Sequence, residues 1–172
     1  VMLNGDTINE GYWIGEGEPD VFTYSGLSVS YPNHDDHYLY FHHAVENAAE
    51  RIVRNNLYFS QIDMEQDGGR GAVVVKDSLV WDGQFAGFGL TKAGNGVDWW
   101  MLVVDYNSPV VRTYTIDEMG ISLHRMDTLS IEGYFFSSAE ARDYSYAGFS
   151  PDGTQFLLYD EGEGLIVFDF DR

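Results

Sequence analysis

The sequence predicts an all-β fold, and three observations lead to this prediction. Short runs of aromatic and β-branched residues recur along the chain, tight-turn signals separate them, and one residue pattern occurs three times. Hydrophobic residues make up 44% and aromatic residues 16% of the 172 residues, which is enough apolar surface to form a core. A chain of this length forms one domain, or at most two small ones.

Seven runs have the composition of strands. Aromatic and β-branched side chains favour the pleated surface of a sheet, and Gly, Asp, Asn or Pro residues bound the runs. The predicted strands cover residues 38–42, 57–64, 72–76, 99–106, 112–116, 155–159 and 165–170.

Turn signals separate these runs. Asn-Gly supplies the positive φ of a tight hairpin, and Pro followed by Asp-Gly suits a type I turn. Short strands with such spacing are typical of antiparallel sandwiches, barrels and propellers. The predicted turns lie at residues 32–35, 67–69, 94–96, 118–120 and 151–153.

One segment has a helical period. Apolar pairs at residues 44–45, 48–49 and 52–53 recur every four residues. This spacing predicts about two turns of helix inserted between two strands. An irregular loop is the alternative interpretation.

An internal repeat narrows the fold class to a propeller. Each copy begins with Gly and small residues, continues through a hydroxyl residue and a tight turn, and ends in an aromatic strand. The copies are about sixty residues apart, and a four-stranded propeller blade needs roughly 40–50 residues, so loops account for the difference. They read GLSVSYP (26–32) into YLYF (38–41), GLT (89–91) into WWML (99–102), and GFSPDG (148–153) into FLLY (156–159).

The repeat predicts a single β-propeller fragment over residues 1–172. It comprises the end of one blade (1–20), two complete blades (21–83 and 84–131) and a partial blade (132–172). Such a fragment has open strand edges, which are templates for pairing. Because the chain opens with Val1 and stops within a blade, we expect further protein segments, or copies of the chain, to complete the propeller.

Several strings resemble a known family. SPDGT at 150–154 resembles the blade turn of WD40-like propellers. LYFSQIDM at 57–64, GNGVDWW at 94–100 and GLIVFDFDR at 164–172 resemble the N-terminal β-propeller of large secreted Bacteroidota proteins, many of which end in a type IX secretion sorting domain. The family usually shows the string HANGRDWW, and here Ala93, Gly94 and Val97 replace its His, Ala and Arg. The resemblance covers nearly the whole chain and implies a secreted or cell-surface location.

The densest group of metal-type ligands is His34, Asp35, Asp36 and His37, with His42 and His43 close by in the sequence. Alternation along a strand sends His42 and His43 to opposite faces, so the first four are the candidate ligands. Imidazole and carboxylate groups together suit zinc, manganese or iron. The same residues occupy a predicted hairpin turn, where Asp and Asn are ordinary, so a solvated turn is the competing interpretation.

Carboxylates suggest two further site types. A pair in a propeller channel would suit glycoside hydrolysis, and Asp63, Asp98, Asp105, Asp143 and Asp169 lie near strand ends. Calcium or another divalent cation would suit the acidic loops at 63–67 and 160–163, although neither has the spacing of a known calcium loop.

Charge and composition limit the partners. Nine Lys and Arg against 28 Asp and Glu give a net charge of -19, which disfavours nucleic acid and anionic membranes. No cysteine is present and no run of residues is apolar and long enough to span a membrane. We therefore expect a non-catalytic extracellular scaffold or interaction module whose partners are protein segments or glycans. A glycan hydrolase with carboxylates in the propeller channel is the alternative.

Overall fold

The chain is all-β, as predicted. The computed structural model describes residues 2–8, 26–48, 51–106, 108–129, 146–160 and 164–172. Two single-turn 3-10 helices accompany the strands, at Gly5–Thr7 and Asp67–Gly69. The strands are β1 (Gly26–Ser30), β2 (His37–Ala48), β3 (Arg51–Asp63), β4 (Ala72–Lys92), β5 (Trp99–Asp105), β6 (Val110–Asp117), β7 (Gly120–Thr128), β8 (Tyr146–Phe149), β9 (Gln155–Asp160) and β10 (Gly164–Asp169).

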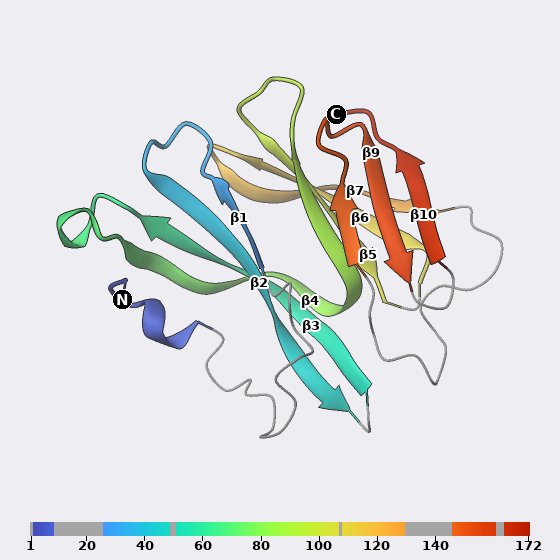
Figure 1. Cartoon of the computed structure of the whole chain (residues 1–172), viewed down its shortest axis with the longest axis horizontal. Helices are drawn as coiled ribbons and strands as arrows, with labels where there is room; N and C mark the ends of the chain where they lie inside the picture. Colours follow the sequence, from blue (N-terminus) through green and yellow to red (C-terminus); the bar gives the residue numbers. More distant parts are fainter. Residues whose placement is uncertain (1, 9–25, 49–50, 107, 130–145, 161–163) are drawn as a thin grey trace.

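These strands form two antiparallel sheets (Figure 1). Strands β1 to β7 follow one another in sequence order in the first sheet, and β8, β9 and β10 form the second. All five predicted turns connect consecutive strands. Within the described strands the arrangement is open, and no barrel or propeller ring is closed.

Strand β4 belongs to two parts of the first sheet. Its first half pairs with β3, from Ala72 opposite Asp63, and this pairing continues to Phe85 opposite Arg54. Its second half pairs with β5, from Phe85 to Lys92. Gly83, with φ of 157°, lies between the halves, and Figure 1 shows β4 curving from one group of strands to the next.

The curvature of β4 makes the two parts of the sheet face each other. The first core joins β1–β3 to the second half of β4, β5 and β6, with Leu39 and Phe41 on one side and Met101 and Ile116 on the other. The second core joins the opposite face of β4–β6 to β8–β10 and contains Leu102, Val104, Phe156 and Leu158. The strands between the two cores are therefore buried on both faces.

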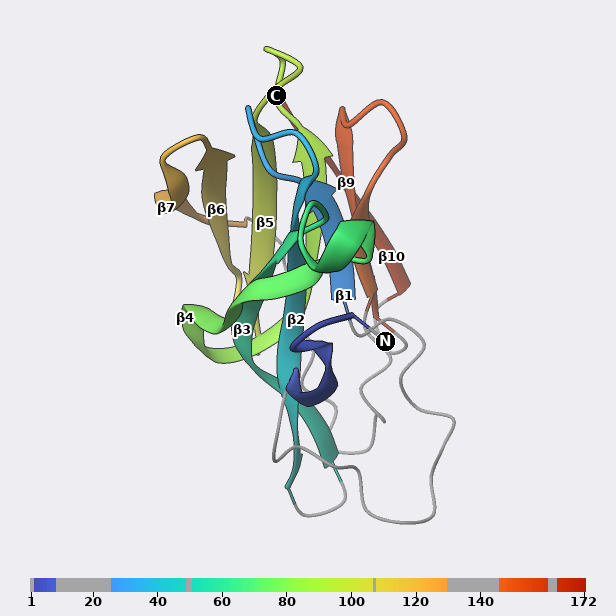
Figure 2. The same cartoon turned by 90° about the vertical axis from the view of Figure 1, so that its left-hand side faces the viewer.

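The predicted helix near residue 50 is wrong. Residues 44–48 belong to β2 and residues 51–53 to β3, which pair from Ala44 opposite Asn55 to Ala48 opposite Arg51. A β-bulge between His43 and Ala44 shifts the register at this point. Pairing between the two arms of an extended hairpin, visible at the lower end in Figure 2, thus overrides the four-residue period.

The start of the chain adds to an edge of the first sheet. Leu3 forms a parallel bridge with Ala72, and the Val73 amide donates to the Leu3 carbonyl at 2.9 Å. Among the described residues, no helix has the length and apolar character needed to cross a bilayer.

Candidate functional site

The four residues predicted to bind metal lie at the turn between β1 and β2. The His34 ring stacks on Tyr31 with ring centroids 4.6 Å apart, and it lies 5.6 Å from the His37 ring. His37 is within hydrogen-bond distance of Gln61, at 3.1 Å, and its Nε2 is 3.8 Å from Asp63.

Asp35 and Asp36 lie at the exposed tip of the same turn. Asp36 has a φ of 59°, and its carbonyl accepts a hydrogen bond from the Met64 amide at 2.9 Å. Across the described ranges, no three His, Asp or Glu side chains are arranged to hold a metal ion. The metal site thus stays a prediction, and the contacts seen here are those of a turn.

The acidic loop after β3 is held by its own hydrogen bonds. Asp63 accepts from the Gln66 side chain and from the Glu65 amide, both at 2.9 Å. These bonds, led by that from Gln66, lower the pKa of the Asp63 carboxyl. Residues 161–163 of the second acidic loop lie outside the described residues.

The other singled-out carboxylates are separated along the fold. Asp98 accepts from the Asn95 side chain at 2.6 Å, and Asp105 makes a bidentate pair with Arg112. Asp169 is exposed in β10, and Asp143 lies outside the described residues. The contacts of Asp98 and Asp105 are therefore those of a turn and of an ion pair.

A buried polar group lies on the side of β2 and β3 away from the first core. His42 Nε2 is 3.0 Å from Ser60 Oγ and 3.4 Å from Asp77 Oδ1, and the ring lies between Tyr40 and Tyr58. Burial lowers the pKa of His42.

This group does not have the geometry of a catalytic triad. In a triad the carboxylate binds the ring nitrogen opposite the serine, whereas here Ser60 and Asp77 both lie against Nε2 of His42. Ser60 is also fully buried. The cluster satisfies polar atoms between strands and offers no nucleophile to a substrate.

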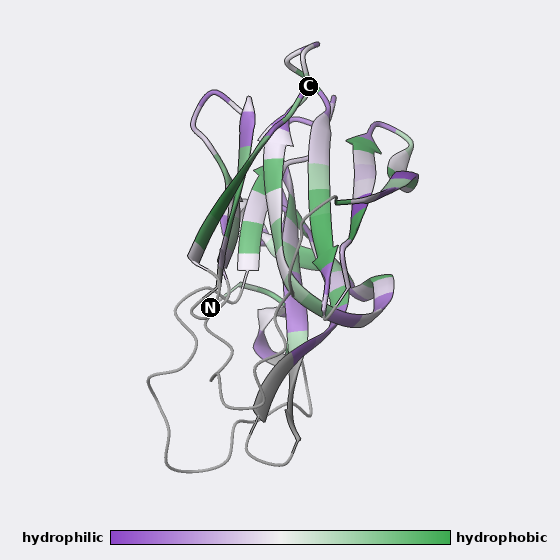
Figure 3. Cartoon of the chain, turned by 90° about the vertical axis from the view of Figure 1, so that its right-hand side faces the viewer, coloured by the Kyte–Doolittle hydropathy of each residue, from purple (hydrophilic) through white to green (hydrophobic). Residues whose placement is uncertain are grey.

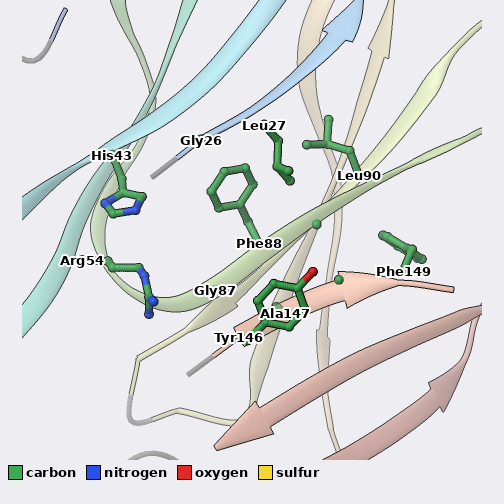
Figure 4. A pocket seen from close by; sticks show the side chains of 12 residues that line it. Gly26, Leu27, His43, Arg54, Gly87, Phe88, Leu90, Tyr146, Ala147 and Phe149 are labelled. Atoms are coloured by element: carbon green, nitrogen blue, oxygen red, sulfur yellow. The ribbon is translucent and has the colours of Figure 1, made fainter. Parts of the chain in front are cut away.

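A cavity of about 230 Å³ lies where β1, β4 and β8 meet (Figure 4). Apolar and small side chains make up most of its wall, and its polar side chains are His43, Arg54 and Tyr146. Nothing among the described residues adds a carboxylate to this wall. The lining residues are 26–27 of β1, 43 of β2, 54 of β3, 87–90 of β4 and 146–149 of β8.

All three copies of the sequence repeat contribute to this cavity. Gly26, Gly89 and Gly148, which begin the three copies, line it, each with the following residue. A Cβ on Gly89 would lie 3.1 Å from the Gly148 Cα, and a Cβ on Gly87 would lie 2.8 Å from the Ala147 Cβ. Glycine is thus needed for β4 and β8 to approach each other closely.

Arg54, the cation in the cavity wall, is positioned by the backbone of β4. Arg54 Nη1 donates to the Ala86 carbonyl at 2.8 Å. His43 is buried, its Nδ1 lies 3.2 Å from the Ala44 carbonyl, and its ring meets Phe85 edge-on. The sequence did not indicate that Arg54 and His43 line a cavity. Their place depends on the pairing of β3 with β4, which joins residues far apart in the chain.

A second candidate site is the outer face of the β8–β10 sheet. We define this outer apolar face by Tyr146, Leu157, Tyr159, Leu165 and Val167. Their register places Leu165 opposite Tyr159, Val167 opposite Leu157, and Tyr146 opposite Tyr159. Leu165 is 60%, Tyr146 50%, Val167 46% and Tyr159 42% exposed.

The adjacent tryptophans point to opposite faces of β5. Trp99 packs against the first core, and its Nε1 donates to the Ser30 carbonyl at 3.0 Å. Trp100 contacts His124 and Phe170 edge-on, with centroids 5.1 and 6.3 Å away. The two rings therefore do not form one platform on which a sugar could stack.

Comparison with known proteins gives no match: the sequence fits no family profile, and no curated protein or solved structure is significantly similar to it.

Proposed function

We propose that the chain is part of a β-propeller that serves as a non-catalytic scaffold or interaction module of a secreted or cell-surface protein. In this proposal the successive blades are β1 to the first half of β4, the second half of β4 to β7, and β8 to β10. The turn of β4 near Gly83 agrees with a blade boundary between residues 83 and 84. Face-to-face packing of three successive groups of strands supports it.

The outer apolar face is the observation that carries the interaction role. A continuous apolar run is typical of a strand that is buried on both faces. Residues 101–104 of β5 form such a run, and all four are buried. Residues 165–168 of β10 form another, yet exposed and partly buried residues alternate along that strand. Figure 3, viewed from this side, shows hydrophobic bands along its strands.

We commit to a further β-sheet as the partner of this face. The first and second cores each join two sheets face to face, and a third such contact would continue the series. Burying a Leu or Val side chain contributes about 1.5–3 kcal/mol, so several of them can hold a sheet in place. The sheet comes either from a longer form of the same chain or from a second copy.

The apolar wall of the cavity favours the scaffold over the hydrolase. Glycoside hydrolysis needs two carboxyl groups around the scissile bond. The described residues that line the cavity include none. The secreted location rests on the resemblance of the sequence, and the net charge of -19 agrees with a highly soluble protein.

The experiment compares the solution mass of the 172-residue chain with that of two double variants. We expect the chain to associate as its concentration rises, and Leu165→Lys/Val167→Lys to remain monomeric. Met119→Lys/Leu123→Lys adds the same charge at residues that are 89% and 49% exposed, and it should associate like the unmodified chain. A Leu165→Lys/Val167→Lys variant that still associates would overturn the role of this face, and a chain that stays monomeric throughout would exclude a second copy as the source of the sheet.

A cysteine probe distinguishes the two sources of the partner sheet. Because the chain has no cysteine, Val167→Cys and Met119→Cys each give a single reactive thiol. If a longer form of the chain supplies the sheet, the thiol at 167 is protected in that form at every concentration. If a second copy supplies it, protection appears only as the concentration rises, while the thiol at 119 reacts rapidly throughout.

A further inference from the structure

We propose that a groove between the first half of β4 and strands β6 and β7 binds a small, uncharged aromatic molecule that carries a hydrogen-bond acceptor. This inference does not depend on the proposed function, because the groove shares no residue with the outer apolar face. The residues that line the groove are 59 of β3, 78–81 of β4, 112 and 114 of β6, and 121 and 123 of β7.

The groove is continuous with the first core. Tyr114 belongs to that core, Phe59 and Trp81 pack against it, and all three also line the groove. Leu79 and Leu123, which are 52% and 49% exposed, add apolar side chains where the groove meets solvent. The groove is therefore a part of the contact between β3–β4 and β6–β7 that stays open to a ligand.

The size and walls of the groove select an aromatic body. Its volume is about 550 Å³, which leaves room for a molecule of two aromatic rings. Three aromatic side chains and several aliphatic ones form most of the wall. Apolar walls with a small number of placed polar groups are typical of small-molecule sites.

Tyr114 supplies the polar group that recognises the ligand. The residue is 5% exposed, and within the described part of the chain its hydroxyl forms no hydrogen bond. Solvent still reaches the hydroxyl oxygen, through the groove that Tyr114 lines. A polar group that is mostly buried and has no protein partner is costly, so an acceptor on a ligand would relieve this cost.

The Tyr114 hydroxyl acts as a donor. Burial raises the pKa of this phenol, so it keeps its proton at neutral pH. A phenol oxygen is also a weak acceptor, because its lone pair is delocalised into the ring. The matching group on the ligand is therefore an acceptor such as a carbonyl oxygen.

Arg112 does not make the groove a charged site. Its Nε and Nη2 each lie 2.9 Å from an oxygen of Asp105, and its Nη1 donates to the Met126 sulfur at 3.2 Å. The guanidinium also faces the Trp81 ring, with 5.0 Å to the centroid. Because its charge is balanced within the protein and no carboxylate is among the described lining residues, an ion in the groove would lose hydration without compensation.

The test uses benzophenone, whose carbonyl is the acceptor, and diphenylmethane, which has the same two rings and no acceptor. Calorimetry and NMR shifts of the 172-residue chain follow the binding. We expect benzophenone to bind and to shift the amides of residues 78–81, 112–114 and 121–123. Tyr114→Phe should weaken benzophenone binding by about twofold to tenfold, because one neutral hydrogen bond is lost.

The Tyr114→Phe variant should bind diphenylmethane as the unmodified chain does, which shows that the groove is intact. Tyr159→Phe removes a hydroxyl from the outer apolar face and should leave benzophenone binding unchanged. Equal benzophenone binding by Tyr114→Phe and the unmodified chain would overturn the proposal, and so would an equal loss for both probes.

A second pair of variants places the site. Leu123→Lys puts a charge at the groove and should abolish the binding of both probes. Met119→Lys adds the same charge outside the groove, at a residue that is 89% exposed, and should leave binding unchanged. The proposal is also overturned if benzophenone fails to shift the groove amides, or if Met119→Lys weakens its binding as much as Leu123→Lys.

Discussion

Asp152 organises the turn between β8 and β9 through hydrogen bonds that only its charged form can accept fully. Its Oδ1 accepts from the Ser150 hydroxyl at 2.6 Å, from the Thr154 hydroxyl at 2.9 Å and from the Thr154 amide at 3.1 Å. These bonds, led by that from Ser150, lower the pKa of Asp152 to about 2. A carboxyl whose pKa is lowered on folding stabilises the fold above its unfolded pKa, and this contribution is lost as the pH falls toward about 2.

We predict that Ser150→Ala raises the pKa of Asp152, because it removes the largest cause of the shift. NMR titration of the side-chain carboxyl carbon measures this pKa directly. Ser122→Ala removes a hydroxyl that lies 3.1 Å from Thr115 Oγ1, at a distant site, and should leave the titration unchanged. An unshifted pKa in Ser150→Ala would show that another contact controls the carboxyl.

Gly153 lies in the same turn and is required for two reasons: its positive φ and the lack of space for a Cβ. Gly96 shares only the positive φ, so a comparison of the two glycines separates these reasons. Gly153 has a φ of 72°, and a Cβ on it would collide with the buried Thr91 side chain. Gly96 has a φ of 73° with nothing within 4 Å. We predict that Gly96→Ala costs about 1 kcal/mol of unfolding free energy from backbone strain alone, and that Gly153→Ala costs about 1–3 kcal/mol more. Denaturant unfolding measures both, and equal costs would contradict the collision.

Single residues could be predicted from sequence where their role is local. The Pro-Asp-Gly string contains its own turn chemistry, so the turn at residues 151–153 needed no other part of the chain. Arg54 carries no such signal. Its place in the cavity depends on pairing opposite Phe85, which lies 31 positions further along the chain.

Among the elements, β5 and β6 are joined by an ion pair that also contacts β4. Arg112 Nε and Nη2 each lie 2.9 Å from an oxygen of Asp105, and the guanidinium lies 5.0 Å from the Trp81 ring centroid. The Arg112 and Asp105 side chains are 19% and 13% exposed, so solvent screens this pair only partly.

We predict that Arg112→Lys lowers the unfolding free energy by about 1–2 kcal/mol, because Lys cannot form the bidentate contact or stack on the ring. The control is Arg125→Lys, in a pair whose side chains are 57% and 47% exposed. It should change stability by less than about 0.5 kcal/mol. Denaturant unfolding of both variants is the measurement, and equal effects would show that the bidentate geometry contributes little.

Composition predicted the strands well because aromatic and β-branched side chains suit the pleated surface of a sheet. All seven predicted runs lie in or largely within strands. The helix predicted around residues 44–53 is wrong because apolar residues that recur every four positions fit a helix and also fit a hairpin that contains a bulge. A bulge depends on the partner strand, so the local pattern cannot reveal it.

At the scale of the whole molecule, the repeat was informative because it places equivalent residues at equivalent points in space. The glycines that begin its three copies meet at one cavity, although they are separated by 63 and 59 positions. What the repeat could not indicate is which polar side chains line that cavity. Arg54 and His43 lie outside the repeated pattern, so these polar parts of the cavity wall come from residues that occur once.

The net charge of the molecule opposes the association that its outer apolar face favours. Each copy carries -19, so two copies repel each other over the screening length, which falls from about 30 Å at 0.01 M salt to about 8 Å at 0.15 M. The apolar contact depends little on ionic strength over this range. We therefore predict that association of the chain through this face strengthens as salt rises from 0.01 to about 0.15 M.

Sedimentation equilibrium at the two ionic strengths measures this effect. The Leu165→Lys/Val167→Lys variant should remain monomeric at both, because it loses the attraction, although it also carries less negative charge. Met119→Lys/Leu123→Lys, with the same charge, should still associate and should respond to salt as the unmodified chain does. Association that weakens with salt would mean that opposite charges, and not the β8–β10 face, hold the copies together.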